Sequence, residues 1–466
     1  MSTPGTIPAP SFIHDLDTCV GCHACVIACA NENRLSPGRF WRQIVSFNPA
    51  HVPDLPVFHL SLACNHCLDA PCVTACPALA IARDGQTGAV VIDNAKCIGC
   101  RYCSWVCPFD APQFNSDAGV MEKCTFCNHR LLQGLQPACT SLCPTGALST
   151  GNYGEKSGVP VDGFPDTKIR PAISFLPMRG RSPQPAPPGA ALPDESQTAL
   201  WASRGSAEVP ESKIALKTEG PLAVFSFVAI ALVAWFLASL RGEAAMVSDL
   251  FGALGVVGIG LSTMHLGRKE RAWRAILNWR GSWLSREVLA YSTFIGIGWI
   301  SGKFFPGIDL IAWVAAFAGV MLLIAVDNVY VAMARERSSH LDGQVSLLSA
   351  AFLVSVLTGS GMLALVTGLL RLYGLIDRMR TQWKKSLGKP KANWLRVFRA
   401  IVGLVLPALL WMMDGEASAS VLVCVLLGEF ADRLDFYDSL DIITPRRSMA
   451  RALMKSAAPG VHPVGK

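Results

Sequence analysis

The sequence is poor in charged residues. Only 16% of its 466 residues are charged and 51% are hydrophobic, whereas about 25% of the residues of a soluble domain are charged. This excludes a disordered chain and a single soluble domain of this length. The net charge of +7 does not indicate nucleic-acid binding, because the basic residues lie beside long apolar runs, where membrane-flanking charge explains them.

The first 18 residues lack the basic region and the apolar core of a secretory signal peptide, and no twin-arginine pair opens the chain. We therefore expect no secretory signal here. Sixteen of the 17 cysteines lie between Cys19 and Cys143, a density otherwise typical of secreted, disulfide-stapled domains. Without a signal peptide, disulfides are not the expected use of these thiols. The last cysteine, Cys424, is expected to be a small packing residue in an apolar helix.

Composition divides the chain into four parts. We expect an α+β, ferredoxin-like iron–sulfur domain at 12–180 and a linker rich in Pro, Gly and Ser at 181–219. An all-α membrane domain is expected at 220–440, followed by a basic tail at 441–466.

The apolar half contains seven runs long enough to cross a membrane. They lie near 221–240, 246–265, 287–305, 308–330, 346–371, 395–413 and 417–432. The fifth run is interrupted at Gly359-Ser360-Gly361, so it is either one long helix or a broken pair. The sequence therefore predicts a polytopic bundle of seven or eight helices.

The cysteines form four groups of four. They are Cys19, Cys22, Cys25 and Cys29; Cys64, Cys67, Cys72 and Cys76; Cys97, Cys100, Cys103 and Cys107; and Cys124, Cys127, Cys139 and Cys143. In bacterial ferredoxins a tight loop presents three thiolates to one [4Fe–4S] cluster, and the fourth cysteine of the run, followed by proline, serves the neighbouring cluster. Four groups therefore predict four [4Fe–4S] clusters.

The ferredoxin arrangement exchanges the fourth ligand between paired groups. The second and third groups then give Cys64, Cys67 and Cys72 with Cys107, and Cys97, Cys100 and Cys103 with Cys76. Pairing the first group with the fourth gives Cys19, Cys22 and Cys25 with Cys143, and Cys124, Cys127 and Cys139 with Cys29. The alternative is structural zinc, which also uses CxxC pairs, but zinc does not require this run and would not need sixteen thiolates.

Three basic residues, Lys96, Arg101 and Lys123, adjoin candidate ligands. They either favour the reduced clusters electrostatically or form ordinary solvated surface, and we expect the second.

These groups, the longer gap before Cys139 and the following TSLCPTGAL resemble the four-cluster iron–sulfur subunit of dimethyl sulfoxide reductase and related molybdopterin enzymes. That resemblance covers about residues 12–180. The apolar half resembles the membrane anchor subunit of the same enzyme, at residues 264–289 and in GEFADRLDFYDS near the end. The chain therefore looks like a fusion of two subunits that are usually separate, and the family's anchor usually has eight membrane helices.

No segment of the chain resembles a molybdopterin domain, so the substrate-reducing site is expected on a partner subunit and no catalytic residue is assigned here. We expect electrons to pass from quinol, with menaquinol the expected type, through the clusters to that partner in anaerobic respiration. One alternative is the reverse direction, from a dehydrogenase partner to quinone, because sequence does not fix cluster potentials. Another is a purely structural assembly anchor.

A quinol site needs a proton acceptor near the cluster side of the membrane, and His and carboxylate side chains suit that role. His265 ends the second apolar run and Glu287 begins the third; the matching anchor positions are associated with quinol oxidation. Arg286 is expected to orient Glu287 or hold the quinone oxygen. Interfacial snorkelling and a surface ion pair are the alternatives. For Asp327 and Glu429, near helix ends, we expect interfacial anchoring.

Charge predicts the side of the inner membrane on which the clusters lie. The loop between the second and third runs carries Arg268, Lys269, Arg271, Arg274, Arg280 and Arg286. The loop after the third offers only Lys303. The positive-inside rule therefore places the cluster domain in the cytoplasm, whereas the resemblance implies the periplasm.

Overall fold

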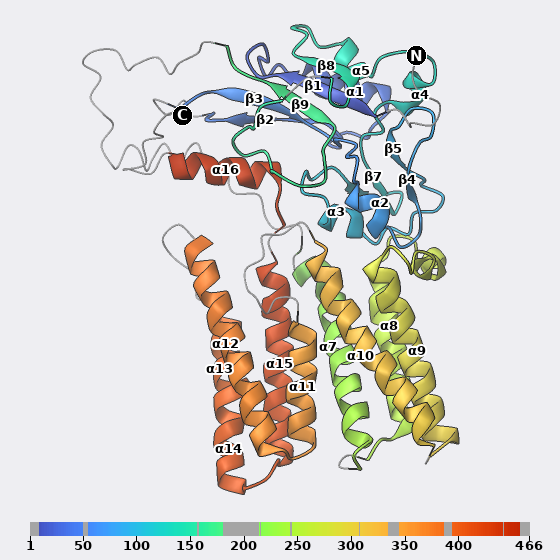
Figure 1. The fold of residues 1–466 in the computed structure, drawn as a ribbon, viewed down its shortest axis with the longest axis vertical. Coiled ribbons are helices and arrows are strands. Elements are labelled where there is room, and N and C mark those ends of the chain that lie inside the picture. Colours follow the sequence, from blue (N-terminus) through green and yellow to red (C-terminus); the bar gives the residue numbers. More distant parts are fainter. Residues whose placement is uncertain are drawn as a thin grey trace, which may run out of the picture. The chain divides into compact units, whose positions relative to one another are not determined.

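The computed structural model describes residues 9–49, 55–155, 158–179, 214, 216–242, 245–306, 308–333, 344–385, 394–440 and 442–456. The chain separates into two compact units (Figure 1). The first contains residues 1–211 together with 443–466, and the second contains 212–442. Most of the expected linker, including all of 180–213, lies outside the described residues.

The first unit is built from short strands and shorter helices. Strand β1 (Pro10–Asp15) is the centre of a three-stranded sheet, antiparallel to β8 (Leu148–Asn152) and parallel to β9 (Ile173–Leu176). The remaining strands form three antiparallel pairs. They are β2 (Gln43–Phe47) with β3 (Phe58–Leu62), β4 (Ile81–Arg83) with β5 (Val90–Ile92), and β6 (Gln113–Asn115) with β7 (Val120–Glu122).

Five helices of the first unit each carry or adjoin candidate ligands. They are α1 (Ala24–Glu32), α2 (Pro71–Ala75), α3 (Tyr102–Trp105), α4 (Asn128–Leu131) and α5 (Ala138–Ser141). Four of them are five residues or shorter, too short to be stable by themselves. The core around them is correspondingly made in large part of cysteine, which indicates that the thiols hold this unit together through what they bind.

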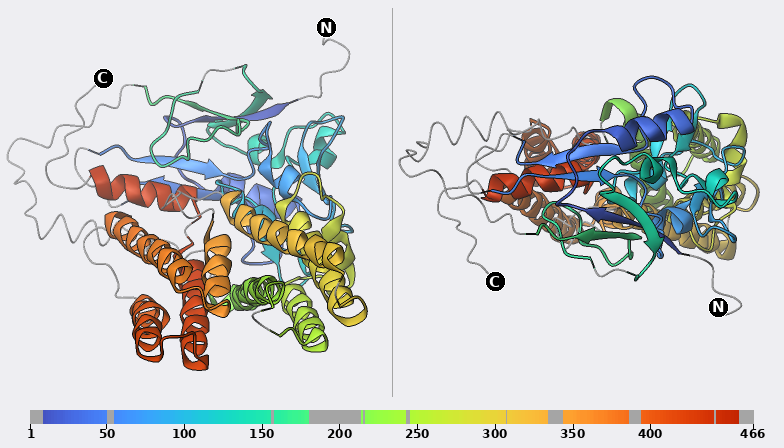
Figure 2. Two further views of the ribbon diagram at one scale, coloured as in Figure 1. Left: turned by 60° about the horizontal axis from the view of Figure 1, so that its bottom comes forward. Right: turned by 90° about the horizontal axis from the view of Figure 1, so that it is seen from above.

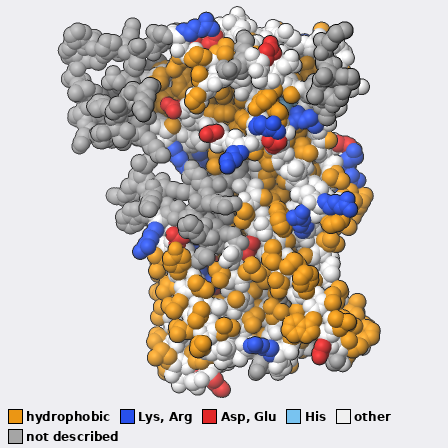
Figure 3. Space-filling model, viewed as in Figure 1, with side chains coloured by type: hydrophobic (Ala, Val, Ile, Leu, Met, Phe, Trp, Pro, Cys, Tyr) orange, Lys and Arg blue, Asp and Glu red, His pale blue; other side chains and the backbone are white. Residues whose placement is uncertain are grey.

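The second unit is a helical bundle. Its helices are α7 (Leu216–Ser239), α8 (Ser248–Met264), α9 (Trp283–Phe304), α10 (Asp309–Val331), α11 (Val345–Leu357), α12 (Gly361–Lys385), α13 (Trp394–Ala400), α14 (Leu406–Asp414) and α15 (Ala419–Ser439). A polar 3-10 segment, η1 (Lys269–Ile276), links α8 to α9, and a π-helical turn, η2 (Ile401–Val405), joins α13 to α14. Large apolar side chains cover the visible outer face of this unit (Figure 3), among them Leu310, Met362 and Met412, each more than 70% exposed.

The expected number of membrane helices is met only in part. Among the described residues, three helices are long and apolar enough to cross a membrane by themselves: Glu219–Ser239, Asp309–Val331 and Trp394–Asp414. A fourth span results if α8 and η1, which meet at a bend of 107°, count as one. The other predicted runs are helical too, but they are short, as α11 is, or carry charge, as α12 and α15 do.

The ambiguous fifth run is a broken pair. Helix α11 ends at Leu357, Gly359 adopts a φ of 64°, and α12 begins at Gly361. The hydroxyl groups of Ser355 and Thr367 then lie 3.3 Å apart, on different helices. The chain therefore doubles back at Gly359, because a left-handed residue at that point reverses its direction at little cost only when it is glycine.

Part of the expected basic tail is a helix that belongs to the first unit. Helix α16 (Pro445–Ser456) lies along strand β2 (Figures 1 and 2). Its Met449 and Leu453 are buried in a cluster with Phe47, Phe58 and Leu60. The chain thus leaves the first unit before α7 and returns to it after α15.

Candidate functional site

The four cysteine groups share one backbone conformation. In each, the residue before the second cysteine has a positive φ: Gly21 (66°), His66 (45°), Gly99 (68°) and Phe126 (59°). Left-handed residues are uncommon outside glycine, so four in equivalent places indicate one repeated loop. At Gly21 glycine is required, because a Cβ there would come within 2.9 Å of the His59 ring.

The structure brings the cysteines together in the four sets that the ferredoxin exchange predicts. The charge of Cys19 is felt with those of Cys22, Cys25 and Cys143, and Cys29 lies with Cys127 and Cys139, near Cys124. A cavity of about 360 Å³ is lined by Cys64, Cys67, Cys72 and Cys107. Another, of about 310 Å³, is lined by Cys76, Cys97, Cys100 and Cys103.

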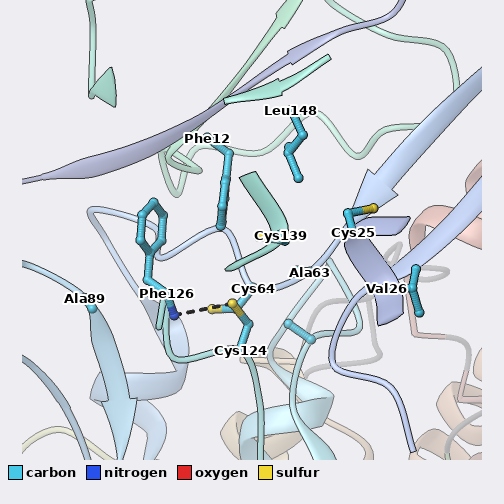
Figure 4. Close-up of a cluster of buried hydrophobic side chains, with 11 residues drawn as sticks. Phe12, Cys25, Val26, Ala63, Cys64, Ala89, Cys124, Phe126, Cys139 and Leu148 are labelled. Atoms are coloured by element: carbon cyan, nitrogen blue, oxygen red, sulfur yellow. Dashed lines mark hydrogen bonds between the residues drawn. The ribbon is translucent and has the colours of Figure 1, made fainter. Parts of the chain in front are cut away.

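Adjacent sets also follow one another. Cys25 is an electrostatic neighbour of Cys139, Cys124 of Cys64, and Cys103 of Cys72. The thiols of Cys64 and Cys124 lie side by side in Figure 4. The four sets therefore form a succession in which the first and fourth groups come at one end and the second and third at the other.

The surroundings of the thiols fit metal clusters. Burial raises the pKa of the Cys29 and Cys72 thiols to about 12, so these side chains need a metal to be thiolates near neutral pH. Backbone N–H groups donate to sulfur, as from Phe126 to Cys124 Sγ (3.4 Å) and from Met121 to Cys97 Sγ (3.4 Å), and such bonds tune cluster potentials. Within the described residues no three His, Cys, Asp or Glu side chains are gathered around a single ion; the sulfurs surround cavities instead.

The expectation that Lys123 is solvated surface is wrong. Lys123 is 2% exposed and lines the cavity of the second cysteine group. Its ammonium donates to the carbonyl oxygens of Val90 and Cys124. Lys96 does lie at the surface, paired with Asp93 at 3.0 Å, and Arg101 is stacked on the Phe114 ring. Of the three, only Lys123 is a buried charge beside the candidate ligands.

Sequence reasoning missed a second buried cation, Arg42. It directly precedes strand β2, is 1% exposed, and lies with its guanidinium carbon 4.5 Å from the centre of the Phe12 ring. One nitrogen donates to Ser61 Oγ at 2.9 Å, and Ser61 Oγ is 3.4 Å from Cys25 Sγ. Its charge acts on Cys139, Cys124, Cys25 and Cys29.

In the second unit, the three candidate quinol residues have different surroundings. His265 is the half-buried residue that ends α8, and Glu287, in the second turn of α9, is buried. Arg286 does not orient Glu287: it donates to the carbonyl oxygens of Trp279 (3.0 Å) and Arg280 (2.6 Å) and stacks on Trp283. Its contacts therefore hold the loop that leads into α9.

Glu287 is a carboxylate without a hydrogen-bond or ion-pair partner in the described part of the chain. The charged group whose field reaches it is Arg433 of α15. Arg433 is buried and donates to Ser226 Oγ of α7 and Ser346 Oγ of α11, while its Nη1 has no partner among the described atoms. A buried acid and a buried base thus share one field without forming an ion pair.

The expectation of interfacial anchoring for Asp327 and Glu429 is wrong. Asp327 is buried and accepts hydrogen bonds from the backbone N–H of Ser346 (2.9 Å) and Leu347. Glu429 is also buried and accepts a bidentate pair from Arg371 of α12. Both carboxylates serve contacts between helices.

Asp432 is the centre of a buried ion network between α12, α13 and α15. Arg371, Arg378 and Arg399 approach its two oxygens at 2.5 to 2.6 Å. Its side chain is 1% exposed. The network places several charges inside helices that a hydropathy average rates as weak spans.

Comparisons with known proteins agree with this division. Residues 55–153 match a family described as a 4Fe-4S dicluster domain, and residues 218–330 match the DMSO reductase anchor subunit. The thiosulfate reductase electron transfer subunit of Salmonella typhi is 41% identical over 148 residues, which cover 31% of this chain and 76% of that protein. A sulfite dehydrogenase subunit of Allochromatium vinosum is 32% identical over 201 residues, covering 36% and 83%.

A protein of Halobacterium salinarum, named as a dimethyl sulfoxide reductase iron-sulfur subunit, is 38% identical over 172 residues, which cover 30% of this chain and 65% of that protein. The chain belongs to the dimethyl sulfoxide reductase family. It is an iron–sulfur electron-transfer subunit of that family fused to its membrane anchor, and so a multi-pass membrane protein. Its relatives are subunits of complexes, which implies a catalytic partner for this dimethyl sulfoxide reductase-type chain as well.

Proposed function

We propose that the chain takes electrons from a quinol of the menaquinol type and passes them through four [4Fe–4S] clusters to a separate molybdopterin subunit. The clusters supply one-electron transfer when bound. The observation that carries the proposal is the succession of four cysteine sets in a chain that also contains a membrane anchor. A wire of this kind has a use only when a membrane-soluble donor or acceptor meets its far end.

We assign the sixteen cysteines as cluster ligands in the exchanged sets, and His265, Arg286 and Glu287 to the quinol site. Glu287 is the proposed proton acceptor, because it is a buried carboxylate whose oxygens make no bond to the described residues. His265 ends the neighbouring helix and is the proposed second acceptor. Arg286 is a positioning residue, since its hydrogen bonds fix the loop before α9.

The reverse direction is the second candidate. One relative is named a sulfite dehydrogenase subunit, and others are named as reductase subunits, so both directions occur among similar chains. A purely structural anchor differs from both, because it would exchange no electrons with the quinone pool.

The test is anaerobic addition of a reduced menaquinol analogue to the purified full chain in lipid nanodiscs. Bleaching of the cluster absorbance is expected within the mixing time or shortly after it. Cluster oxidation by the corresponding quinone, without bleaching by the quinol, would favour the dehydrogenase direction. If neither occurs while dithionite reduces the clusters, the membrane unit is an anchor only.

Metal content gives an independent prediction. Anaerobically purified chain is expected to contain about sixteen irons and about sixteen sulfides, since four cubanes need sixteen thiolates. Cys100→Ser is expected to disturb one cluster, in the pair that shares Cys76 and Cys107. The control is Cys424→Ser, which removes the thiol of α15 and is expected to leave iron and sulfide unchanged. Stoichiometric zinc with negligible sulfide would refute the assignment.

We further infer that the chain crosses the membrane eight times. Helices α11 and α12 double back at Gly359, and α16 belongs to the same unit as the cysteines. A chain that leaves one side of a membrane and returns to it crosses an even number of times, which supports eight passes over seven. The six basic residues between α8 and α9 support the cytoplasm as the side of the cluster domain.

Reporter fusions test the number of passes and the side together. Alkaline phosphatase fused after residue 200 or after residue 466 is expected to be inactive, and after residue 243 active. The opposite pattern at all three sites would move the cluster domain to the periplasm and leave eight passes intact. Different activities at residues 200 and 466 would contradict an even number.

A further inference from the structure

Arg42 is a buried charge without a carboxylate. Its side chain is almost wholly shielded from solvent, and no Asp or Glu among the described residues forms an ion pair with it. One nitrogen, Nη1, donates to the carbonyl and hydroxyl oxygens of Ser61. The other two nitrogens, Nε and Nη2, have no partner in the described part of the chain.

Such a side chain is costly unless something else in the fold compensates it. A buried guanidinium needs a counter-charge and acceptors for its five N–H groups. The groups around Arg42 are sulfurs: Ser61, its hydrogen-bond partner, lies 3.4 Å from Cys25 Sγ. Cys29, Cys124 and Cys139 complete its electrostatic neighbourhood. The buried core that contains these thiols, with Phe12 beneath the guanidinium, is drawn in Figure 4.

We propose that Arg42 is the built-in counter-charge of the two clusters held by the first and fourth cysteine groups, and that it raises their reduction potentials. The proposal rests on the proposed function, since it requires those two clusters. Cys25 belongs to one of the two exchanged sets, and Cys29, Cys124 and Cys139 belong to the other. Arg42 therefore adjoins ligands of both clusters, and its free N–H groups are donors for their sulfur atoms.

The sign of the effect follows from charge. Reduction of a cluster by one electron adds one negative charge, and a nearby fixed cation stabilises the more negative state. Net charge and hydrogen bonds to sulfur are among the factors that set cluster potentials. Burial increases the effect, because no solvent screens the interaction. Removal of the charge must then lower the potentials of these two clusters and leave those of the second and third groups nearly unchanged.

The experiment is a potentiometric titration of the full chain followed by electron paramagnetic resonance. In Arg42→Gln, two of the four midpoint potentials are expected to fall by about 59 mV or more, a tenfold change in the reduction equilibrium of a one-electron couple. Arg42→Lys keeps the charge and is expected to recover at least half of the shift. Arg179→Gln, which alters an arginine with 73% side-chain exposure in the same unit, is the matched control and is expected to change no potential.

Ser61→Ala separates charge from hydrogen bonding, because it removes the acceptor of Arg42 and keeps the guanidinium. It is expected to shift the potentials less than Arg42→Gln. Unchanged potentials in Arg42→Gln, with full iron and sulfide content, overturn the proposal and leave the proposed function standing. Absence of sulfide from the unmodified chain refutes the proposed function itself.

A second measurement needs no loss of the charge. In chain labelled with ¹⁵N-arginine, pulsed electron paramagnetic resonance of the reduced clusters is expected to detect coupling to arginine nitrogen. That coupling is expected to disappear in Arg42→Lys. If the labelled, unmodified chain has clusters and shows no arginine coupling, Arg42 does not donate to them and the proposal fails, whether or not Arg42→Gln assembles.

Discussion

Glu287→Gln is expected to slow quinol-driven reduction of the clusters by about 10²- to 10⁴-fold, the usual contribution of a positioned proton acceptor. Quinol oxidation releases two protons with its two electrons, so the electrons leave only as the protons are accepted. Glu287 is suited to accept one, because it is a buried carboxylate that no hydrogen bond or ion pair occupies in the described part of the chain. Glutamine has the same shape and cannot take up the proton.

His265→Leu is expected to slow the same step. The measurement is anaerobic stopped-flow spectroscopy of cluster bleaching by a menaquinol analogue. Dithionite reduction serves as the internal control, because it bypasses the quinol site and should be unchanged in both variants. Glu270→Gln is the matched control variant, since Glu270 lies in η1 near α9 with a side chain 61% exposed. Unchanged quinol kinetics in both Glu287→Gln and His265→Leu would return these residues to ordinary structural roles.

The cysteine sets show what local sequence can predict. Spacing within each group sets the loop, and the loop conformation recurs in all four, at Gly21, His66, Gly99 and Phe126. The non-local pairing of the first group with the fourth also agrees with the structure, where Cys29 lies with Cys127 and Cys139. It is predictable because the ferredoxin exchange is a rule about pairs of groups rather than about neighbours in the chain.

Buried charge is not predictable in the same way. Nothing in the segment around Arg42 or Lys123 distinguishes an arginine or lysine that points inward from one that points to solvent. Both lie beside strands or loops of alternating polarity, and the direction is decided by the tertiary fold. The only sequence signal is proximity to a ligand cysteine, which Lys123 has and Arg42, thirteen residues after Cys29, lacks.

The membrane helices are difficult to predict for a related reason. Hydropathy counts each charge as a cost, whereas Arg371 and Arg378 of α12 are compensated by carboxylates of α15. That compensation exists only when the helices pack together. The apolar character of the sequence fades near residue 376, yet the helix continues to Lys385, and two helices therefore look like one ambiguous span.

Asp432→Asn is expected to destabilise the bundle by about 3–5 kcal/mol, the cost of removing one partner from a buried ion pair. Three guanidinium groups, from Arg371, Arg378 and Arg399, converge on the Asp432 carboxylate. With asparagine there, Arg371 retains Glu429 as a partner, but Arg399 loses its only ion-pair partner among the described residues. The result is an uncompensated positive charge inside the bundle, which is far more costly than the loss of an exposed pair.

Thermal unfolding of the full chain in detergent, followed by tryptophan fluorescence, measures the effect of Asp432→Asn as a lower transition temperature. Asp414→Asn is the matched control, because Asp414 is an exposed aspartate at the end of α14, and a surface change of this kind is expected to stay within about 0.5 kcal/mol. Arg399→Leu combined with Asp432→Asn removes one of the stranded cations and is expected to recover part of the lost stability, since coupled partners are not additive. Equal transition temperatures for Asp432→Asn and Asp414→Asn would show that the network does not hold α12, α13 and α15 together.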